Sequence, residues 1–324
     1  MERSIAKVSP MPYRIAVVGV FCTLVAGCYG SVSSPQSSPL PESMVAAGKA
    51  SRLIFSSSAS NNTIDYYAKG TGPNNPVAGS LSGSFSNPEG IASDSHGNIY
   101  VANNNAENVL VYAAGSSSPT GTLDDPGEFP VGVTVGPDGT VYVANLDGPI
   151  GASGDVVIYA PGSSEPTETL HDKCFLRVLG VALDQHGNLF ASCQIAPGAG
   201  HGEVVEFKAG STKGTQTHIS LETAGGLGFD GAGHLLAIDV NGPTLNVYDG
   251  GNRKPIDTLK LPGASIYFSF DRDSKELYVA DYALGEIDVF RYRPSKLTQI
   301  NTITNGMSPS SGNIGIANIP PQQE

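Results

Sequence analysis

The side chains best suited to chemistry in this 324-residue chain are oxygen-bearing residues that end a repeated strand pattern. Four of them occupy equivalent positions: Asn103, Asn145, Asp239 and Asp281. Carboxylate and amide oxygens suit a hard cation such as calcium. A structural role is the alternative, because an Asp or Asn at a strand end commonly bonds the backbone of its own turn. These four residues are therefore candidate metal ligands, with the local role left open.

A second polar set is expected close to these strand ends. The chain repeats a four-stranded unit, in which the two-to-three loops and the four-to-one loops emerge on one side, the usual binding face. The residues in or beside the four-to-one loops are Glu89, Glu128, Arg177, Glu222 and Tyr267. Together with the strand ends, they predict an oxygen-rich, ligand-binding ring at the mouth of a central channel.

Only one histidine, His201, is expected at this mouth, in the glycine-rich segment 193–203. It is a candidate acid or base, although a single loop histidine is more often solvated. His96, His186 and His234 belong to turns on the opposite face or directly follow them. The sequence contains no Ser-His-Asp set, phosphate loop, clustered metal-ligand motif or cofactor fingerprint.

The elements that position these residues are short strands in a six-fold repeat. The phrase NIYVAN (98–103) recurs at 140–145, 188–193, 234–239 and 276–281, with a degenerate copy at 52–57. After each copy, a second strand ends in an aromatic residue: Tyr67, Tyr112, Tyr159, Phe207, Tyr248 and Phe290. Successive aromatic residues in this series are 45, 47, 48, 41 and 42 residues apart. A period of 40–50 residues with several strands per unit is typical of a β-propeller. The sequence thus predicts an all-β fold, a six-bladed β-propeller over residues 51–319.

Glycines mark the start of the innermost strands, where neighbouring blades must approach closely. They are Gly90, Gly132, Gly180 and Gly226, and Tyr267 replaces the glycine in the sixth blade, where its ring is expected to reach into the channel. Blade one lacks a first strand of its own. The matching pattern lies at 312–317, so we expect the C-terminus to supply that strand and close the ring.

The segments PEGIASD (88–94) and IYVAN (99–103) resemble NHL repeats, and 109–115 and 156–162 resemble secreted bacterial NHL-like propellers of unassigned function. The motifs that carry this resemblance are structural and imply no chemistry. Because the chain has abundant structural repeats and no catalytic constellation, we expect a surface-displayed binding or scaffold module for an unknown protein, peptide or glycan. The alternative is a metal-dependent hydrolase or lyase, since gluconolactonase-like lactonases share the shape and hold a divalent cation with Glu, Asn and Asp. Their surrounding motifs are absent here, and the chain has no Trp, which is frequent in carbohydrate platforms.

The chain has a net charge of −12 and no stripe of basic residues, which argues against a nucleic-acid partner. Forty glycines and twenty-three prolines are consistent with many short strands and turns. We expect a soluble, monomeric propeller with an acidic surface.

The N-terminus has the pattern of a targeting segment. Basic residues precede an apolar run at 15–26 that is too short to span a membrane, and VAGC (25–28) resembles the lipobox of bacterial lipoproteins. That resemblance implies cleavage before Cys28 and acylation there, with the outer membrane favoured because Tyr29 is not Asp. An ordinary secretory signal with a chance cysteine is the alternative, and Met11 is an alternative start. Residues 28–50 predict a Ser/Pro-rich tether, and 320–324 a short tail.

Export permits disulfides, and the mature domain keeps two cysteines, Cys174 and Cys193. They are expected at the same end of one hairpin in blade four, which favours a bridge over a metal or catalytic role. The long glycine-rich loops 146–155 and 193–203 predict that ligand contacts concentrate on blades three and four of the face that carries these loops.

Overall fold

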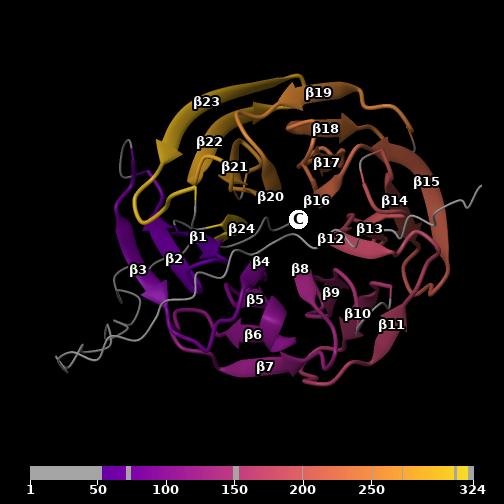
Figure 1. The fold of residues 1–324 in the computed structure, drawn as a ribbon, viewed down its shortest axis with the longest axis horizontal. Helices are drawn as coiled ribbons and strands as arrows, with labels where there is room; N and C mark the ends of the chain where they lie inside the picture. Colours follow the sequence, from indigo (N-terminus) through magenta and orange to yellow (C-terminus); the bar gives the residue numbers. More distant parts are fainter. Residues whose placement is uncertain are drawn as a thin grey trace, which may run out of the picture. The chain divides into compact units, whose positions relative to one another are not determined.

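The computed structural model describes residues 53–70, 74–148, 153–198, 200–250, 252–271, 273–309 and 312–319. Within these residues, 24 strands form six four-stranded antiparallel sheets around one axis (Figure 1), which confirms the predicted six-bladed β-propeller. A single 3-10 turn, η2 (Asn104–Ala106), interrupts the described strands and loops. No helix among the described residues has the length and hydrophobicity needed to cross a bilayer. The predictions for residues 1–52 and 320–324 lie outside the described residues.

Each blade is ordered from its innermost to its outermost strand, with one blade completed by the last strand of the chain. Blade one consists of β24 (Asn313–Ile319), β1 (Leu53–Ser58), β2 (Thr63–Ala68) and β3 (Val77–Leu81). Blade two consists of β4 (Pro88–Ser93), β5 (Ile99–Asn103), β6 (Asn108–Tyr112) and β7 (Gly121–Asp124). Blade three consists of β8 (Pro130–Val135), β9 (Val141–Asn145), β10 (Val156–Tyr159) and β11 (Glu168–Leu170). Blade four consists of β12 (Arg177–Leu183), β13 (Leu189–Gln194), β14 (Gly202–Phe207) and β15 (Gly214–Leu221). Blade five consists of β16 (Ala224–Phe229), β17 (Leu235–Asp239), β18 (Thr244–Tyr248) and β19 (Asp257–Lys260). Blade six consists of β20 (Ser265–Phe270), β21 (Glu276–Asp281), β22 (Glu286–Arg293) and β23 (Lys296–Ile303).

The ring closes as predicted, because β24 pairs antiparallel with β1 and Leu53 lies opposite Ile319. Contacts between blades one and six add to this pairing. Lys69 forms an ion pair with Asp271 at 2.9 Å. The Tyr67 hydroxyl donates to the Asn305 carbonyl at 2.9 Å. Because β24 covers the inner edge of β1, this edge is not free for another chain to add a strand.

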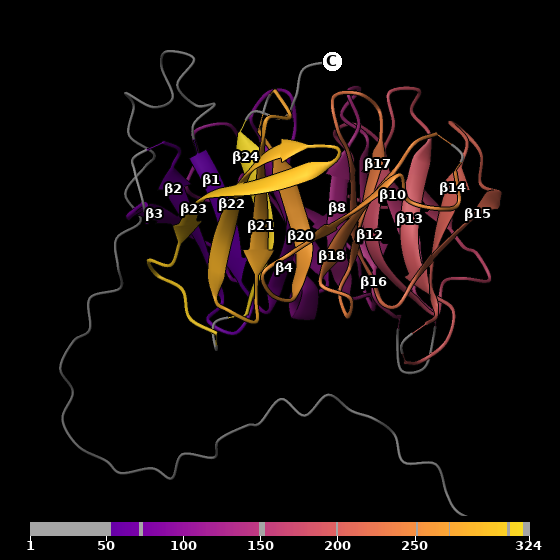
Figure 2. The same ribbon diagram turned by 90° about the horizontal axis from the view of Figure 1, so that it is seen from above.

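The propeller has two faces, which differ in their connections (Figure 2). The turn face carries the links between first and second strands, such as 94–98 and 184–188, and the loop face carries the two-to-three and four-to-one loops. On the turn face, Asp94 accepts the backbone N–H groups of His96 and Asn98, both at 2.9 Å. Gly97 follows with φ of +85°, a conformation that favours glycine. The predicted turn chemistry is therefore confirmed.

The periodic aromatic residues are core, as predicted. All six are at most 4% exposed. Three of them also bond the neighbouring blade: besides Tyr67, the Tyr112 hydroxyl donates to the Ser82 carbonyl at 3.0 Å and the Tyr159 hydroxyl to the Asp124 carbonyl at 2.8 Å. A buried hydroxyl needs such a partner, so the repeat of Tyr both fills and links the blades.

Disulfide formation is also confirmed. Cys174 and Cys193 are bonded, with their Cα atoms 5.9 Å apart. Both residues are completely buried. The bridge joins the segment that precedes β12 to the end of strand β13, at the loop face of blade four.

The glycines at the axis have no room for a side chain. A Cβ atom on Gly90 would lie 2.4 Å from the Val131 carbonyl oxygen, and one on Gly180 would lie 2.9 Å from the Cα of Gly226. A Cβ on Gly315 of β24 would meet the Glu89 carbonyl oxygen at 1.9 Å. The innermost strands that carry these glycines thus pack backbone to backbone against the next strand, as the sequence predicts.

We expect Gly90→Ala to lower the free energy of unfolding by about 1–3 kcal/mol, because the methyl group would force β4 and β8 apart. Gly121→Ala is the matched control. Its Cβ would meet nothing closer than 3.7 Å. The control should be neutral or slightly stabilising. Denaturant unfolding of both variants measures the difference, and equal stability would contradict the close packing at the axis.

Candidate functional site

Tyr267 reaches across the central channel. Its hydroxyl lies 2.7 Å from the carbonyl oxygen of Val131 on β8 and 2.6 Å from that of Leu179 on β12. Since a hydroxyl has one proton, the two carbonyls share it. Burial is the main cause that raises the Tyr267 pKa well above its usual value, and the nearby Glu89 charge adds to the effect. The tyrosine therefore stays neutral and remains a donor.

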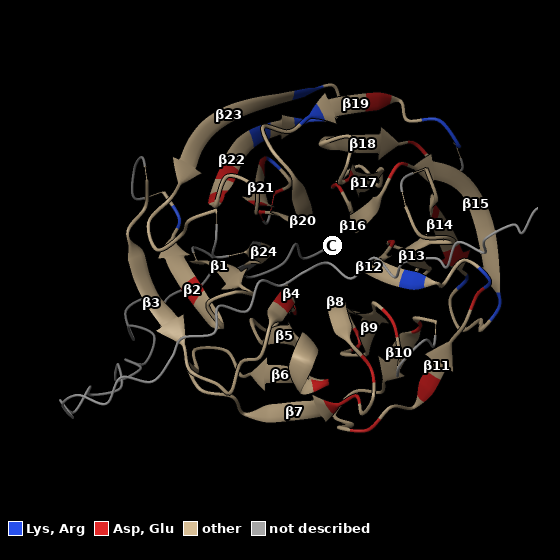
Figure 3. Ribbon diagram, in the orientation of Figure 1, with Lys and Arg blue, Asp and Glu red and all other residues tan. Residues whose placement is uncertain are grey.

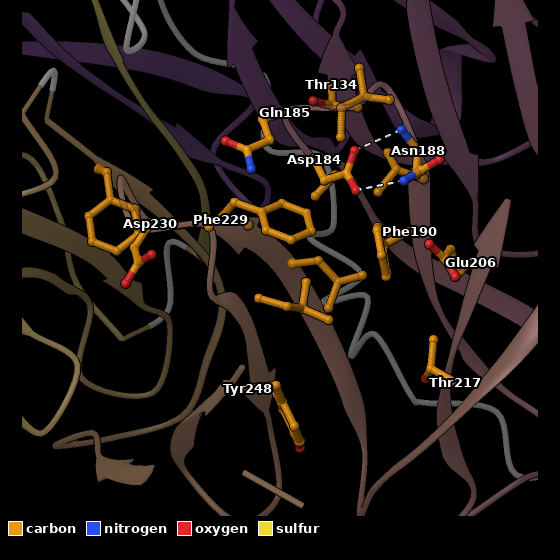
Figure 4. Close-up of a pocket in the computed structure, with 18 of the residues that line it drawn as sticks. Thr134, Asp184, Gln185, Asn188, Phe190, Glu206, Thr217, Phe229, Asp230 and Tyr248 are labelled. Atoms are coloured by element: carbon orange, nitrogen blue, oxygen red, sulfur yellow. Dashed lines mark hydrogen bonds between the residues drawn. The ribbon is translucent and has the colours of Figure 1, made fainter. Parts of the chain in front are cut away.

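On the turn-face side of Tyr267 lies a cavity with a volume of about 1310 Å³. We call it the funnel. Its inner end is a collar of one large apolar residue from each blade: Ile316, Ile91, Val133, Val181, Leu227 and Phe268. From the collar the funnel widens between blades four and five, where Phe190 and Phe229 pack edge to face with ring centroids 5.2 Å apart (Figure 4).

Polar groups of the funnel wall are mostly held by the turns. Asp184 accepts two bonds from Asn188, from its backbone N–H and from its side-chain amide, each at 2.8 Å (Figure 4). Asp230 accepts from the Tyr292 hydroxyl at 2.9 Å and lies 2.9 Å from the His234 ring. These carboxylates are structural. Other polar residues, such as Gln185, Glu206 and Thr217, also line the funnel, so it offers a ligand a mixed wall around an apolar collar.

The residues proposed from sequence lie on the loop face, as their strand positions require, but they do not form one ring of free oxygens. Asn103 accepts the Ser86 N–H at 2.7 Å and donates to the Ser84 carbonyl at 3.1 Å. Asp239 accepts the N–H groups of Glu222 and Thr223 at 2.8 and 3.0 Å. Both side chains hold a neighbouring four-to-one loop, which is the structural alternative considered above.

Asn145 and Asp281 differ from these two because each keeps a buried oxygen without a hydrogen-bond partner. Asn145 donates its amide to Asp155 at 2.9 Å, which leaves Oδ1 unpartnered. Asp281 accepts from Ala283 and Leu284 through Oδ1, which leaves Oδ2 unpartnered. The four equivalent positions therefore divide into two that support loops and two that retain free oxygens.

The remaining candidates lie apart from one another. Glu89 is at the axis beside Tyr267, whereas Arg177 and Glu222 are exposed. His201 is partly exposed, and its carbonyl accepts the Ile195 N–H at 3.0 Å. The described histidines that contact a carboxylate are those of the turns, His96, His186 and His234. Across the described ranges, no three His, Cys, Asp or Glu side chains are grouped as a metal centre made of them would require.

Sequence reasoning missed the funnel, although a signal for its collar was present. A large apolar residue directly follows every axis position, as in Gly90-Ile91, Gly132-Val133 and Tyr267-Phe268. Alternation along a strand then turns this residue away from the packed glycine contact. The acidic group of Asp125 and Asp155 near Asn145 was also missed, because it joins two blades.

No protein-family model matches the sequence, and no curated protein matches it. Solved structures resemble the fold. The chain from "Crystal structure of Nidogen/Laminin Complex" has a TM-score of 0.69 at 14% identity, covering 84% of this chain and 99% of that one. A protein of unknown function from Bacteroides caccae has a TM-score of 0.60 at 12% identity over 83% and 99%. A streptogramin B lyase has a TM-score of 0.51 at 11% identity over 70% and 72%. These likenesses show the propeller fold, and the NHL-type resemblance stays a prediction.

Burial raises the pKa of Glu89 to about 7, while a hydrogen bond from Asn87 opposes the shift. The ionised form is thus disfavoured in the folded state, so stability falls as the pH rises from about 4.5 to 7. We expect Glu89→Gln to raise the free energy of unfolding by about 1–2 kcal/mol at pH 8 and to leave it nearly unchanged at pH 4.5. Exposed Glu165→Gln is the control. Denaturant unfolding at both pH values tests this, and an equal effect of Glu89→Gln at the two values would contradict the shift.

Proposed function

We propose that this protein is an exported, lipid-anchored β-propeller that binds a peptide or protein partner and performs no catalysis. The observation that carries the proposal is the funnel, a cavity with an apolar collar and two aromatic rings in its wall. Ligand sites are typically concave and about 300–1,000 Å³ in volume, and the funnel exceeds that range, so it has room for a bulky side chain and its neighbours.

The composition of the wall favours a partner that inserts an aliphatic or aromatic side chain. The collar offers dispersion contacts on all sides, and Phe190 and Phe229 extend them toward the turn face. An aromatic anchor in a desolvated pocket is the usual centre of a protein interface. A glycan is less well matched, because the chain has no Trp to provide a broad stacking platform.

Fold neighbours are consistent with either binding or catalysis, since one comes from a structure of a nidogen/laminin complex and another is a streptogramin B lyase. Fold alone does not decide between them. The hydrolase or lyase alternative has one supporting observation, the buried carboxyl of Glu89 with a pKa of about 7 at the axis. A general acid with that pKa would suit neutral pH. Purified protein that hydrolyses lactones, with loss of that activity in Glu89→Gln, would favour the enzyme.

The binding proposal is tested with a phage-displayed random peptide library selected against the full chain. We expect enriched peptides to share an apolar anchor residue. Thr134→Trp, which places a bulky ring on the funnel wall, should weaken them about tenfold or more, equivalent to about 1.4 kcal/mol. Thr122→Trp, the same change on the exposed outer strand β7, should leave affinity unchanged. Fluorescence anisotropy with labelled peptides measures both.

Thermal unfolding must first show that Thr134→Trp folds. Peptides that still bind Thr134→Trp, but are lost when the loops 148–154 and 196–202 are shortened, would place the site on the loop face, where the sequence predicts it. Selection that enriches no apolar anchor would contradict the funnel as a binding site.

The anchoring part of the proposal rests on the lipobox-like VAGC at 25–28. We expect Cys28→Ala to move the protein from the membrane fraction to the soluble fraction, since the acyl chains provide the membrane affinity. Cys22→Ala is the control within the same segment. Labelling with a palmitate analogue followed by fractionation measures this, and membrane retention of unlabelled Cys28→Ala would contradict lipid anchoring.

A further inference from the structure

Buried and half-buried carboxylates lie on the loop face between blades two and three, and none of them forms an ion pair with a cation among the described residues. Asp125 and Glu128 lie in the connection from β7 to β8, and Asp155 lies at the start of β10. Figure 3 shows acidic segments over these connections. Burial raises the pKa of Asp155, against smaller opposing effects of the Asn145 hydrogen bond and of His171.

Three oxygens in this group are buried and unpartnered: Oδ2 of Asp125, Oε2 of Glu128 and Oδ1 of Asn145. Asn145 is 0% exposed and Asp125 is 2% exposed. A buried oxygen that lacks a donor is destabilising, and native structures usually provide one. The residues that carry these oxygens interact with one another through Asp125, and such a set indicates a ligand that supplies positive charge.

The local backbone holds these oxygens near one another. The Glu128 N–H bonds the Asp125 carbonyl at 3.2 Å, so the two carboxylates belong to one turn. The Asn145 amide donates to Asp155 at 2.9 Å, which fixes its orientation and leaves Oδ1 as an acceptor. Asp125 lies close enough to Asn145 and to Tyr159 for both side chains to act on its protonation, and its charge also acts on Glu128.

We propose that Asp125, Glu128 and the side-chain oxygen of Asn145 bind a divalent hard cation, with calcium as the favoured ion. Two carboxylates balance its charge, the amide adds a neutral oxygen, and water completes the six to eight ligands that calcium takes. Asp155 acts behind this set by orienting Asn145. Only two of the ligands are carboxylates, so the site differs from a centre built wholly from acidic, His or Cys side chains. It is independent of the funnel, which opens on the other face.

The cation would stabilise the junction of two blades. Asp125 and Glu128 lie in the loop that precedes β8. Asn145 is the last residue of β9, directly before the loop 146–155. Ion binding would therefore fasten the base of that loop and raise stability by mass action, because the unfolded chain holds no preformed site.

The test compares the melting temperature of the full chain, purified after exposure to EDTA, with and without millimolar Ca²⁺. We expect a rise of about 5 °C and one-to-one binding heat in calorimetry. The double variant Asp125→Asn and Glu128→Gln should melt higher than the native chain in EDTA, because buried like charges are removed, and should lose the response to Ca²⁺.

Asp288→Asn is the matched control. Asp288 is also completely buried with an unpartnered oxygen, but it lies on β22 of blade six and accepts from Gln299 at 2.6 Å. This variant should keep the full response to Ca²⁺. A response that is lost in Asp288→Asn and kept in the double variant would overturn the proposal and move the ion to blade six.

A second measurement does not depend on the folding of the double variant. Terbium replaces calcium and emits when a nearby tyrosine is excited, and Tyr159 lies beside Asp125. The chain has no Trp to interfere. We expect terbium emission from the native chain that Ca²⁺ displaces and that Tyr159→Phe reduces severalfold, whereas Tyr142→Phe leaves it unchanged. Absence of emission together with no melting shift in Ca²⁺, Mg²⁺ or Mn²⁺ would overturn the proposal.

Discussion

The close approach of the innermost strands at the axis is the constraint on which the rest of the propeller depends. Backbone meets backbone at Gly90, Gly180 and Gly315, where a single added carbon would collide with the next blade. Six blades can surround so narrow an axis only if this contact repeats. Tyr267 is the exception that completes the arrangement, because its ring occupies the space that glycines leave and its hydroxyl bonds the carbonyls of two other blades.

Tyr267 lies across the axis, where its hydroxyl reaches the carbonyls of two other blades. The collar lines the inner end of the funnel, whereas the candidate ion site lies on the loop face. A ligand in the funnel and an ion between blades two and three would therefore act at separate places. Their coupling would have to pass through the packed blades, whose cores are continuous across the blade interfaces.

Much of the fold was predictable because propeller repeats restate the same local chemistry in each unit. The turn Asp94 to Gly97, the buried Tyr112 and Tyr159, and the completing strand β24 all follow from the period of the sequence. The bridge between Cys174 and Cys193 followed from their places at one end of a hairpin. These features depend on contacts within one blade or between equivalent positions of neighbours.

The candidate sites were less predictable, since they depend on how unlike positions meet. Asn103 and Asn145 are equivalent in sequence, yet Asn103 is saturated by its loop while Asn145 retains a free oxygen beside Asp155. The difference arises from the loop that each residue happens to meet. The shape of the funnel likewise depends on the sizes of side chains from all six blades together, and no single repeat determines it.

Hydrogen bonding also separates structural acids from candidate ligands. On the turn face, Asp94 and Asp184 accept the donors of their own turns, so their charge is balanced locally. On the loop face, Asp125 and Glu128 have buried oxygens with no donor. Burial of an unbalanced charge is costly, and a chain can remove that cost only by protonation or by binding a cation. Acidic residues that only stabilise turns do not leave buried oxygens without a donor. The unpartnered oxygens of Asp125 and Glu128, more than the number of acidic residues, therefore indicate where this protein binds a cation.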